Sequence, residues 1–437
     1  MFNQRHTAVI IATISLLSAC SGSGSSGNSD PTTQPIAKGV SNPTYTDHVA
    51  AILNDNCVTC HRSGGIAPFT LDNYANASTY AAAIKADINS RIMPPFLADN
   101  SGACNTFSHA RWLSDADIET LNNWVDQGEA PGDPAAPLPP PVQSGLTPAE
   151  ISTTISMSEV YTPKASTVEN PNDDYHCFVL DPGITGADKF LTAYQVAPGN
   201  AALVHHIVLF AINSQAAEDA AVALDQKEAG PGYTCFGDSG VDLSLAADVP
   251  VVAGWAPGIK ETRFPAGTGV RLKAGRKMIM QVHYNLENAP GTDLTSMDLA
   301  LQDSVSSEAT MGIVADTTMT IPAGQADAAF TASFTVPTNY PTLKVHGLFP
   351  HMHTLGRSMT IERQPANGGP AQCLANLPRW SFEWQQYYFY DGAPLSVNPG
   401  DKINVTCHYD TRSRTQPVTW GNGTQDEMCL SFFYITL

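Results

Sequence analysis

Short apolar runs separated by Gly, Pro and Asn turns fill the chain from about residue 149 to its end. The runs are rich in β-branched and aromatic residues, and few of their apolar positions recur at helical spacing. This pattern predicts strands of antiparallel sandwiches. Because about 290 residues are more than one simple sandwich needs, we expect two in succession. The clearest strands are "FLTAYQVAPGN", "LVHHIVLF", "MIMQVHYNL", "TLKVHGLFPHMHTLG", "INVTCHYD" and "CLSFFYITL".

Before residue 131 the pattern is helical instead. Apolar residues recur at helical spacing in "YTDHVAAILNDNC" and in "SDADIETLNNWVDQG". Ser114 is a good N-cap for the second of these helices, and Gly128 ends it. The apolar positions are Tyr45, Val49, Ile52 and Leu53 in the first segment and Ile118, Leu121, Trp124 and Val125 in the second. We therefore expect a small α-helical domain over residues 41–130.

The first residues of the chain have the features of a secretory signal. Arg5 and His6 precede an apolar run, residues 8–17, that is too short to span a membrane. The run ends in "LSAC", which resembles the bacterial lipoprotein cleavage box and implies removal of residues 1–19 and a lipid on Cys20. The alternative is an ordinary signal peptide beside a chance cysteine. We expect an exported protein, held to a membrane by its lipid only, in the periplasm or at the outer-membrane surface of a Gram-negative-type bacterium.

Two segments of biased composition separate the expected folded parts. Residues 20–40 are Gly/Ser-rich and predict a flexible tether, and residues 131–148 are Pro-rich and predict an extended linker. The chain has 41 acidic and 22 basic residues, for a net charge of −19, and no cluster of Lys and Arg. This charge distribution argues against a nucleic-acid partner.

The helical domain carries "CVTCH" at residues 57–61, the spacing of covalent haem attachment in exported proteins. Cys57 and Cys60 would each bond one haem vinyl group, and His61 would ligate the iron. A zinc half-site or a redox dithiol is the alternative, but either would leave His61 without a role. With its flanking helices the motif resembles a small class I cytochrome c, which implies haem c as a cofactor.

The sixth iron ligand is predicted to be Met93 in "RIMPPF". A Met ligand raises the reduction potential of a haem and suits electron transfer, and Pro94 and Pro95 would stiffen the ligand loop. His48 and His109 are competing candidates, although both are more typical of surface histidines.

Histidines stand out in the predicted strands of the second region. His205 and His206 are adjacent in one apolar strand, and His283 lies in another. His351 and His353 are two residues apart, so they share one face of a strand and could hold one metal ion. A single His in a strand is usually a hydrogen-bonded core residue, but two pairs in apolar strands indicate metal ligands.

Four motifs of this region resemble, in order and spacing, those of the copper type II ascorbate-dependent monooxygenases. They are "LVHHIVLF", "GWAPGIKETRFPAGTGVRLKAGRKMIMQVHYN", "PHMHTLGRSMTI" and "DEMC", and the resemblance covers roughly residues 155–437. It implies two copper ions, held by two jelly-roll-like sandwiches at about 149–312 and 313–437 that face a solvent-filled cleft.

The resemblance also implies the ligands of each copper ion. They are His205, His206 and His283 for a copper that stores and passes an electron, and His351, His353 and Met428 for the catalytic copper that reacts with dioxygen. A thioether ligand favours Cu(I), the state that reacts with dioxygen. Neighbouring strand residues normally face opposite ways, so a bulge or a choice of ring nitrogen must bring His205 and His206 to one metal.

The cysteines are only partly explained by the resemblance. It implies a disulfide between Cys407 and Cys429, beside the Met ligand. Cys177 matches a family position, and its partner could be Cys235. The cysteines without an assignment are Cys104 and Cys373.

Other aromatic and histidine residues lie near these motifs. Trp380, Phe382 and Trp384 alternate in "RWSFEW" and predict one buried face of a strand, with a substrate wall as the alternative. For His346 and His408 we favour packing roles over ligation.

The substrate pocket implied by the resemblance lacks a charged clamp. Peptide-amidating members have an Arg two residues before the His-x-His pair, where this chain has Phe349, and a Tyr after the Met ligand, where it has Phe432. Gln281 matches a family Gln. Because Phe cannot replace a bidentate Arg, we expect a less polar substrate and no peptidylglycine amidation.

The function expected from these observations is copper-dependent monooxygenation, in which a C–H bond of a small organic substrate is hydroxylated with dioxygen. The fused haem would take electrons from a periplasmic donor and dock near the histidine-only copper, and an ascorbate-like external reductant is a second electron source. One alternative is a non-catalytic copper and haem redox lipoprotein. Another makes the haem domain a docking or sensing module.

Overall fold

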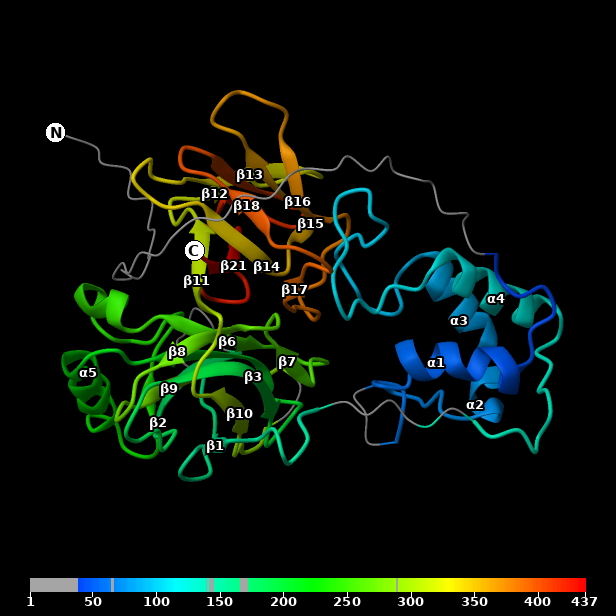
Figure 1. The fold of residues 1–437 in the computed structure, drawn as a ribbon, viewed down its shortest axis with the longest axis horizontal. Helices are drawn as coiled ribbons and strands as arrows, with labels where there is room; N and C mark the ends of the chain where they lie inside the picture. Colours follow the sequence, from blue (N-terminus) through cyan, green and yellow to red (C-terminus); the bar gives the residue numbers. More distant parts are fainter. Residues whose placement is uncertain (1–37, 64–66, 139, 141–144, 166–171, 288–289) are drawn as a thin grey trace. The chain divides into compact units, whose positions relative to one another are not determined.

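The computed structural model describes residues 38–63, 67–138, 140, 145–165, 172–287 and 290–437. The expected signal peptide, Cys20 and nearly all of the expected tether lie outside these residues. The described residues form two compact units, one of residues 38–96 and 111–140, and the other of residues 97–110 and 145–437 (Figure 1). Within the described part, no helix is both long and apolar enough to cross a membrane.

The first unit is helical. Its elements are the π-helix η1 (Tyr45–Val49) and the α-helices α1 (Ala50–Asn56), α2 (Tyr74–Thr79), α3 (Ala81–Asn89) and α4 (Asp115–Asp126). Both helices predicted from apolar spacing are confirmed. Ser114 caps α4 by accepting from the backbone N–H of Asp117, whose carboxylate accepts from the N–H of Ser114 in return. Gly128 follows the helix at φ 87°, where a side chain would be strained.

The helical unit has its own core. The ring of Tyr45 lies 6.2 Å from that of Trp124, so the first and last helices pack together. Leu53 and Leu121 are fully buried in the same cluster. Burial of one stripe of each amphipathic helix is the main source of stability for such short helices.

The second unit is mainly β, as the strand pattern predicted. Its first half contains β1 (Thr153–Ser156), β2 (Asp173–Leu180), β3 (Lys189–Ala197), β4 (Val204–Ala211), α5 (Gln215–Asp225), β5 (Tyr233–Thr234), the 3-10 helix η2 (Leu243–Asp248), β6 (Val251–Trp255), β7 (Glu261–Arg263), β8 (Thr268–Leu272), β9 (Met278–Asn285) and β10 (Ser296–Gln302). Its second half contains β11 (Ser307–Ala315), β12 (Thr320–Ile321), β13 (Ala328–Thr335), β14 (Leu343–His351), β15 (Gly356–Gln364), β16 (Gln372–Leu377), β17 (Tyr388–Phe389), β18 (Leu395–Val397), β19 (Lys402–Tyr409), β20 (Val418–Thr419) and β21 (Leu430–Thr436).

One large sheet runs through both halves of this unit (Figure 1). Its strand order is β1-β10-β3-β8-β11-β21-β14-β17. A five-stranded sheet, β5-β2-β9-β4-β6, belongs to the first half, and a four-stranded sheet, β13-β19-β15-β16, to the second. The strand β11 joins the halves, because it pairs in parallel with β8 and antiparallel with β21. The expected boundary at residues 312 and 313 falls inside this joining strand.

Two features differ from the pattern-based expectations. Residues 97–110, inside the expected haem domain, belong to the second unit. The segment around Trp380, Phe382 and Trp384 is a loop and not a strand, so that prediction was wrong. Pro378 directly follows β16 and has no N–H to continue a ladder, which ends the strand there.

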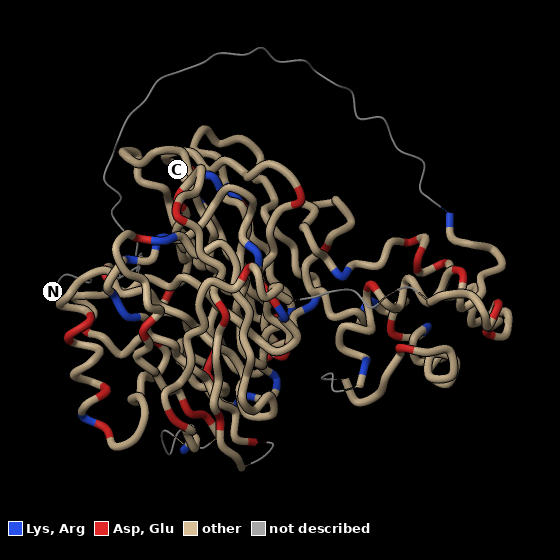
Figure 2. The backbone as a smooth tube through the Cα atoms, turned by 60° about the horizontal axis from the view of Figure 1, so that its bottom comes forward, with Lys and Arg blue, Asp and Glu red and all other residues tan. Residues whose placement is uncertain are grey.

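Charged side chains are spread along the chain. Lys and Arg are scattered among the more numerous Asp and Glu (Figure 2), in keeping with 22 basic and 41 acidic residues. Several form exposed ion pairs, such as Arg263 with Glu150. Pairs of this kind contribute little to stability, and the acidic excess chiefly favours solubility.

Candidate active site

A β-bulge brings the adjacent histidines of β4 together. In the pairing of β4 with β9, Val204 lies opposite Tyr284 but His206 lies opposite His283, so His205 is an extra residue in the ladder. The bulge breaks the alternation that would otherwise send the two imidazoles to opposite faces. Of the two routes that the sequence left open, the backbone uses the bulge.

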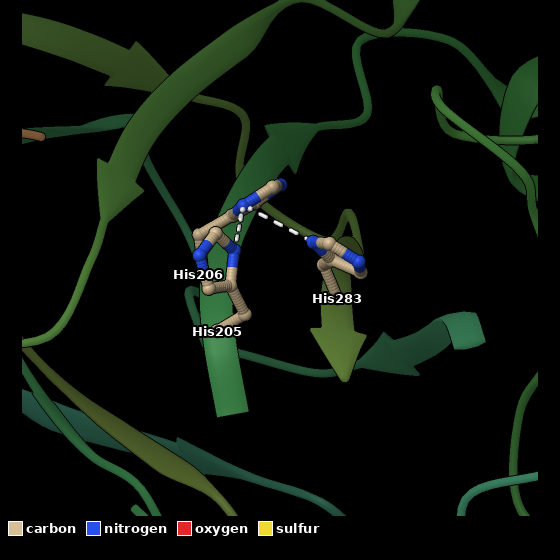
Figure 3. Close-up of side chains that lie close together, drawn as sticks. All are labelled: His205, His206 and His283. Carbon is tan, nitrogen blue, oxygen red and sulfur yellow. Dashed lines mark hydrogen bonds between the residues drawn. The ribbon is translucent and has the colours of Figure 1, made fainter. Parts of the chain in front are cut away.

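The three imidazoles of β4 and β9 converge on one point (Figure 3). The Nδ1 atom of His206 lies 3.1 Å from Nδ1 of His205 and 3.4 Å from Nδ1 of His283. One ligand atom from each ring lies within 4.8 Å of the others, which is the spacing of donors around one metal ion. Among the described residues, these three histidines are the one group of at least three His, Cys, Asp or Glu side chains whose ligand atoms are close enough to hold a metal ion.

These imidazoles are held neutral. Burial, and then the neighbouring rings, lower the pKa of His206 and His283 well below its usual range. Burial and the nearby His351 lower the pKa of His205 to about 4. Since only a deprotonated ring nitrogen can bind a metal, the site is in a ligating state at neutral pH.

Asp173 orients the third ring. Its Oδ1 lies 3.0 Å from Nε2 of His283, so Nε2–H donates to the carboxylate and Nδ1 is left free for a metal. The same carboxylate accepts from the backbone N–H of Thr424 at 3.0 Å and from its hydroxyl at 2.8 Å. Asp173 therefore links this metal site to the segment just before Met428.

Replacing Asp173 with Asn is expected to weaken copper binding at this site by about 10- to 100-fold, because an amide oxygen is a weaker and uncharged acceptor for Nε2–H. Titration with Cu(II) followed by electron paramagnetic resonance would measure the loss. Asp174→Asn is the matched control, because Asp174 is equally buried but accepts from Tyr161 and Lys164 instead. Unchanged affinity in Asp173→Asn would contradict the orienting role.

The second pair of histidines uses the other ring nitrogen. The Nδ1 atom of His351 lies 2.6 Å from Oε1 of Gln385, and Nδ1 of His353 lies 3.1 Å from the carbonyl of Asp426. Both Nδ1–H groups donate to these oxygens, so each Nε2 is left as the ligand atom. Burial lowers the pKa of both rings, that of His353 to about 3.

Glu427 holds the two parts of this second site together. It is fully buried, and its carboxylate accepts from the backbone N–H groups of His353, at 2.9 Å, and Leu355. Burial raises its pKa to about 7. Because Glu427 directly precedes Met428, these bonds fix the thioether segment relative to the His-x-His turn.

The two sets of ligands lie close together and are not separated by the expected solvent-filled cleft. The rings of His206 and His351 are 6.2 Å apart between centroids. Phe382 stacks on His205 at 4.4 Å and lies 5.8 Å from His353. The five imidazoles therefore form one buried group, packed around an aromatic ring that the sequence had placed in a strand.

One cavity of about 190 Å³ opens onto both sets of ligands. His206, His351, His353 and Met428 contribute to its wall, so the methionine borders the same cavity as the second histidine pair. The rest of the wall is largely apolar and includes Ile313, Trp255, Phe349, Tyr387, Leu430 and Phe432. Phe349 and Phe432, which the sequence analysis assigned to the substrate pocket, are both part of this wall, and the ring of Phe349 packs 4.9 Å from that of Tyr387.

The remaining residues singled out in the second unit have other partners. Gln281 lies at the cavity wall, but its side-chain amide donates to the carbonyls of Cys235 and Asp238. His346 bonds the Thr436 hydroxyl, and His408 bonds Asp327. The disulfides join Cys177 to Cys235, Cys407 to Cys429 and Cys104 to Cys373.

In the helical unit, Cys57 and Cys60 are free thiols, whereas the other six described cysteines are paired. The Nδ1 atom of His61 lies 3.1 Å from the Phe69 carbonyl, so Nδ1–H donates to it and Nε2 remains available for iron. Both observations fit covalent haem. Met93 and His48 belong to the same unit, whereas His109 belongs to the other.

Three site residues were missed in the sequence: Asp173, Gln385 and Glu427. Glu427 lies inside the motif "DEMC", and Asp173 begins the stretch "DDYHC" that contains Cys177. In both, an acidic residue next to apolar strand residues was a usable signal. Gln385 had no such signal, because it lies in a loop 34 residues after His351.

Two family models match the part of the chain that carries these residues. The model of the copper type II ascorbate-dependent monooxygenase N-terminal domain matches residues 158–290, and that of the C-terminal domain matches residues 308–436. Among curated proteins, the chain is 24% identical to DBH-like monooxygenase protein 2 of Mus musculus, over 60% of this chain and 44% of the relative. It is 25% identical to dopamine beta-hydroxylase of Rattus norvegicus, over 68% and 48%, and 25% identical to tyramine beta-hydroxylase of Caenorhabditis briggsae, over 60% and 42%. The chain thus spans less than half the length of these relatives.

Proposed function

Because the chain belongs to the copper type II ascorbate-dependent monooxygenase family, we propose that it hydroxylates a C–H bond of a small organic substrate with dioxygen. The observation that carries the proposal is one cavity bordered by two sets of neutral imidazoles, one of them beside a thioether. When bound, two copper ions would supply the two electrons that reduction of dioxygen by this route requires.

The chain's own residues prepare the two sites differently. His205, His206 and His283 present three Nδ1 atoms, an all-nitrogen set suited to holding and passing an electron. His351 and His353 present Nε2 atoms, and Met428 adds a soft sulfur donor that favours Cu(I). The buried position of these ligands keeps bulk water away from the reacting atoms.

The cavity indicates a neutral, largely apolar substrate. In the described part of the chain, no Asp, Glu, Lys or Arg contributes to its wall. Two relatives are named for the amines dopamine and tyramine, but here an ammonium group would meet no carboxylate, and a carboxylate would meet no Arg. The position of a charged clamp is taken by Phe349, beside Phe432 and Leu430.

Charged analogues are therefore expected to be turned over much less efficiently than neutral ones. An unpaired charge buried in this wall costs about 3–5 kcal/mol, so kcat/KM should fall at least about 100-fold. Oxygen consumption and product formation would be compared for an alkylbenzene and for the same molecule ending in an amine or a carboxylate. A glycine-extended peptide should also be inert, and efficient turnover of the amine, acid or peptide would contradict a neutral substrate.

We also propose that the helical unit holds haem c through Cys57, Cys60 and His61, with Met93 as the other axial ligand. Two observations support this assignment. Both cysteines are free thiols, and Nδ1 of His61 is occupied by its hydrogen bond to the Phe69 carbonyl, which leaves Nε2 for iron. A covalent haem with a Met ligand would supply single electrons at a raised potential. The haem would take electrons from a periplasmic donor, in an exported protein that is lipid-anchored at Cys20, as the first twenty residues suggest.

The competing function is a redox protein that binds copper and haem without turnover. Metal analysis of the purified full-length protein should give two copper ions and one haem per chain in either case. A screen of neutral aromatic and aliphatic molecules decides between them, because an oxygenase consumes dioxygen in step with hydroxylated product. Copper and haem in place with no substrate-dependent oxygen consumption across the screen would favour the redox protein.

A further inference from the structure

Among the described residues, the chain passes between the two units three times. It leaves the helical unit after Phe96, returns at Arg111, and is again in the other unit from Gly145. The intervening segment of residues 97–110, which we call the strap, belongs to the unit that carries the metal ligands. The Pro-rich linker is therefore not the sole connection between the helical unit and the rest of the chain.

The strap is bonded to β16 along its first part. Cys104 forms a disulfide with Cys373, across 269 residues of sequence. The side-chain amide of Asn105 donates to the carbonyls of Cys373 and Leu374, each at 2.9 Å. The backbone N–H of Asp99 donates to the carbonyl of Asn376 at 2.8 Å.

The end of the strap is bonded to the segment that contains β17. Phe107 is buried, and its ring lies 5.5 Å from the rings of both Tyr388 and Tyr390. The backbone N–H of Ser108 donates to the carbonyl of Phe389 at 2.8 Å, and that of Asp391 donates to the carbonyl of Thr106 at 2.9 Å.

The segment that receives the strap also reaches the active site. Gln385 accepts the Nδ1–H of His351, and Tyr387 forms part of the cavity wall. A short piece of chain, residues 385–391, thus contacts a ligand of the oxygen site at one end and the strap at the other.

We propose that the strap is an anchor that limits how far the electron-donating helical unit can move from β16 of the C-terminal copper domain. The proposal rests on the proposed function of the helical unit as a haem donor. Met93 precedes Asp99 by six residues, a stretch that spans at most about 22 Å. Whatever the motion of the helical unit, the loop of its axial ligand stays within that distance of a strap residue bonded to β16.

This anchor is compatible with the docking near the histidine-only copper that the sequence suggested, because the rings of His206 and His351 lie only 6.2 Å apart. A second attachment raises the effective concentration of the donor above the value that the linker of residues 131–148 gives alone. Each transfer converts one ferrous haem to ferric haem and one Cu(II) to Cu(I), and no proton or atom moves with the electron.

The test uses the full-length protein with haem and copper, as wild type and as Cys104→Ser with Cys373→Ser. A second variant, Asn105→Ala with Phe107→Ala, loosens the strap without removing the disulfide. Hydrogen exchange of residues 97–110 reports whether the strap is released. Stopped-flow absorbance reports re-oxidation of the ferrous haem on mixing with substrate and oxygen, and ascorbate-driven turnover reports whether the copper sites are intact.

We expect faster exchange of the strap in both variants, haem re-oxidation slowed at least about 10-fold, and unchanged ascorbate-driven turnover. If amide hydrogen exchange of residues 97–110 stays at the wild-type level in both variants, the proposed anchor is overturned. Re-oxidation at the wild-type rate from a released strap would overturn its role in electron delivery. If the haem of the wild-type protein is not re-oxidised at all, the proposed haem donor fails, and the strap's role in delivery fails with it.

Discussion

Met428→Ile is expected to lower substrate-dependent oxygen consumption by at least about 100-fold while sparing copper at the three-histidine site. Loss of residues that merely orient metal ligands costs about 10- to 100-fold, and loss of a ligand should cost no less. Ile has nearly the volume of Met, so the swap should change stability by less than about 1.5 kcal/mol. The thioether, and not the packing, is therefore what the variant removes.

Copper content and oxygen consumption measured on the same sample would check this expectation. The matched control is Met359→Ile, which removes another buried thioether, from β15. It should keep both copper ions and full turnover. Wild-type turnover in Met428→Ile would show that Met428 does not serve the oxygen site.

Cys57→Ala with Cys60→Ala is expected to abolish covalent haem and to block turnover driven by a protein electron donor, while ascorbate still supports activity. Without the thioether bonds the haem is held by axial ligands alone and is lost when the protein is denatured. The copper ligands belong to the other compact unit, so their affinity for copper should not change. The donor-driven rate should fall by at least about 100-fold, because a tethered donor at roughly millimolar effective concentration is removed.

Haem absorbance after denaturing electrophoresis, together with turnover under each reductant, would measure both effects. His109→Ala is the control, because His109 is exposed and lies in the strap, and its loss should leave the haem spectrum unchanged. Equal donor-driven turnover with and without the two cysteines would remove the haem from the electron path.

Local pattern was enough to predict most of the elements that carry the site. The strands that became β3, β4, β9, β14, β19 and β21 are runs of apolar, β-branched residues, and the helices α1 and α4 have apolar residues at helical spacing. Such periodicity is a property of neighbouring residues, so the sequence alone reveals it. The histidine ligands were equally visible, because buried imidazoles in apolar strands are costly unless they bind something. Met428 was assigned only through the family resemblance, because a buried thioether carries no such cost.

The sequence did not determine the arrangement of the groups around those ligands, because it depends on contacts between distant parts of the chain. Asp173 bonds His283 across 110 residues and Thr424 across 251, and the strap reaches β16 through a disulfide across 269. The bulge at His205 depends on pairing with β9, and the loop at Phe382 on packing against His205 and His353. A buried polar group needs a partner, but which residue supplies it is decided only when the chain has folded. The sequence thus determined which residues could hold the metals, and only the tertiary structure decided which ring nitrogen each offers, how close the two sites lie, and where the strap is bonded.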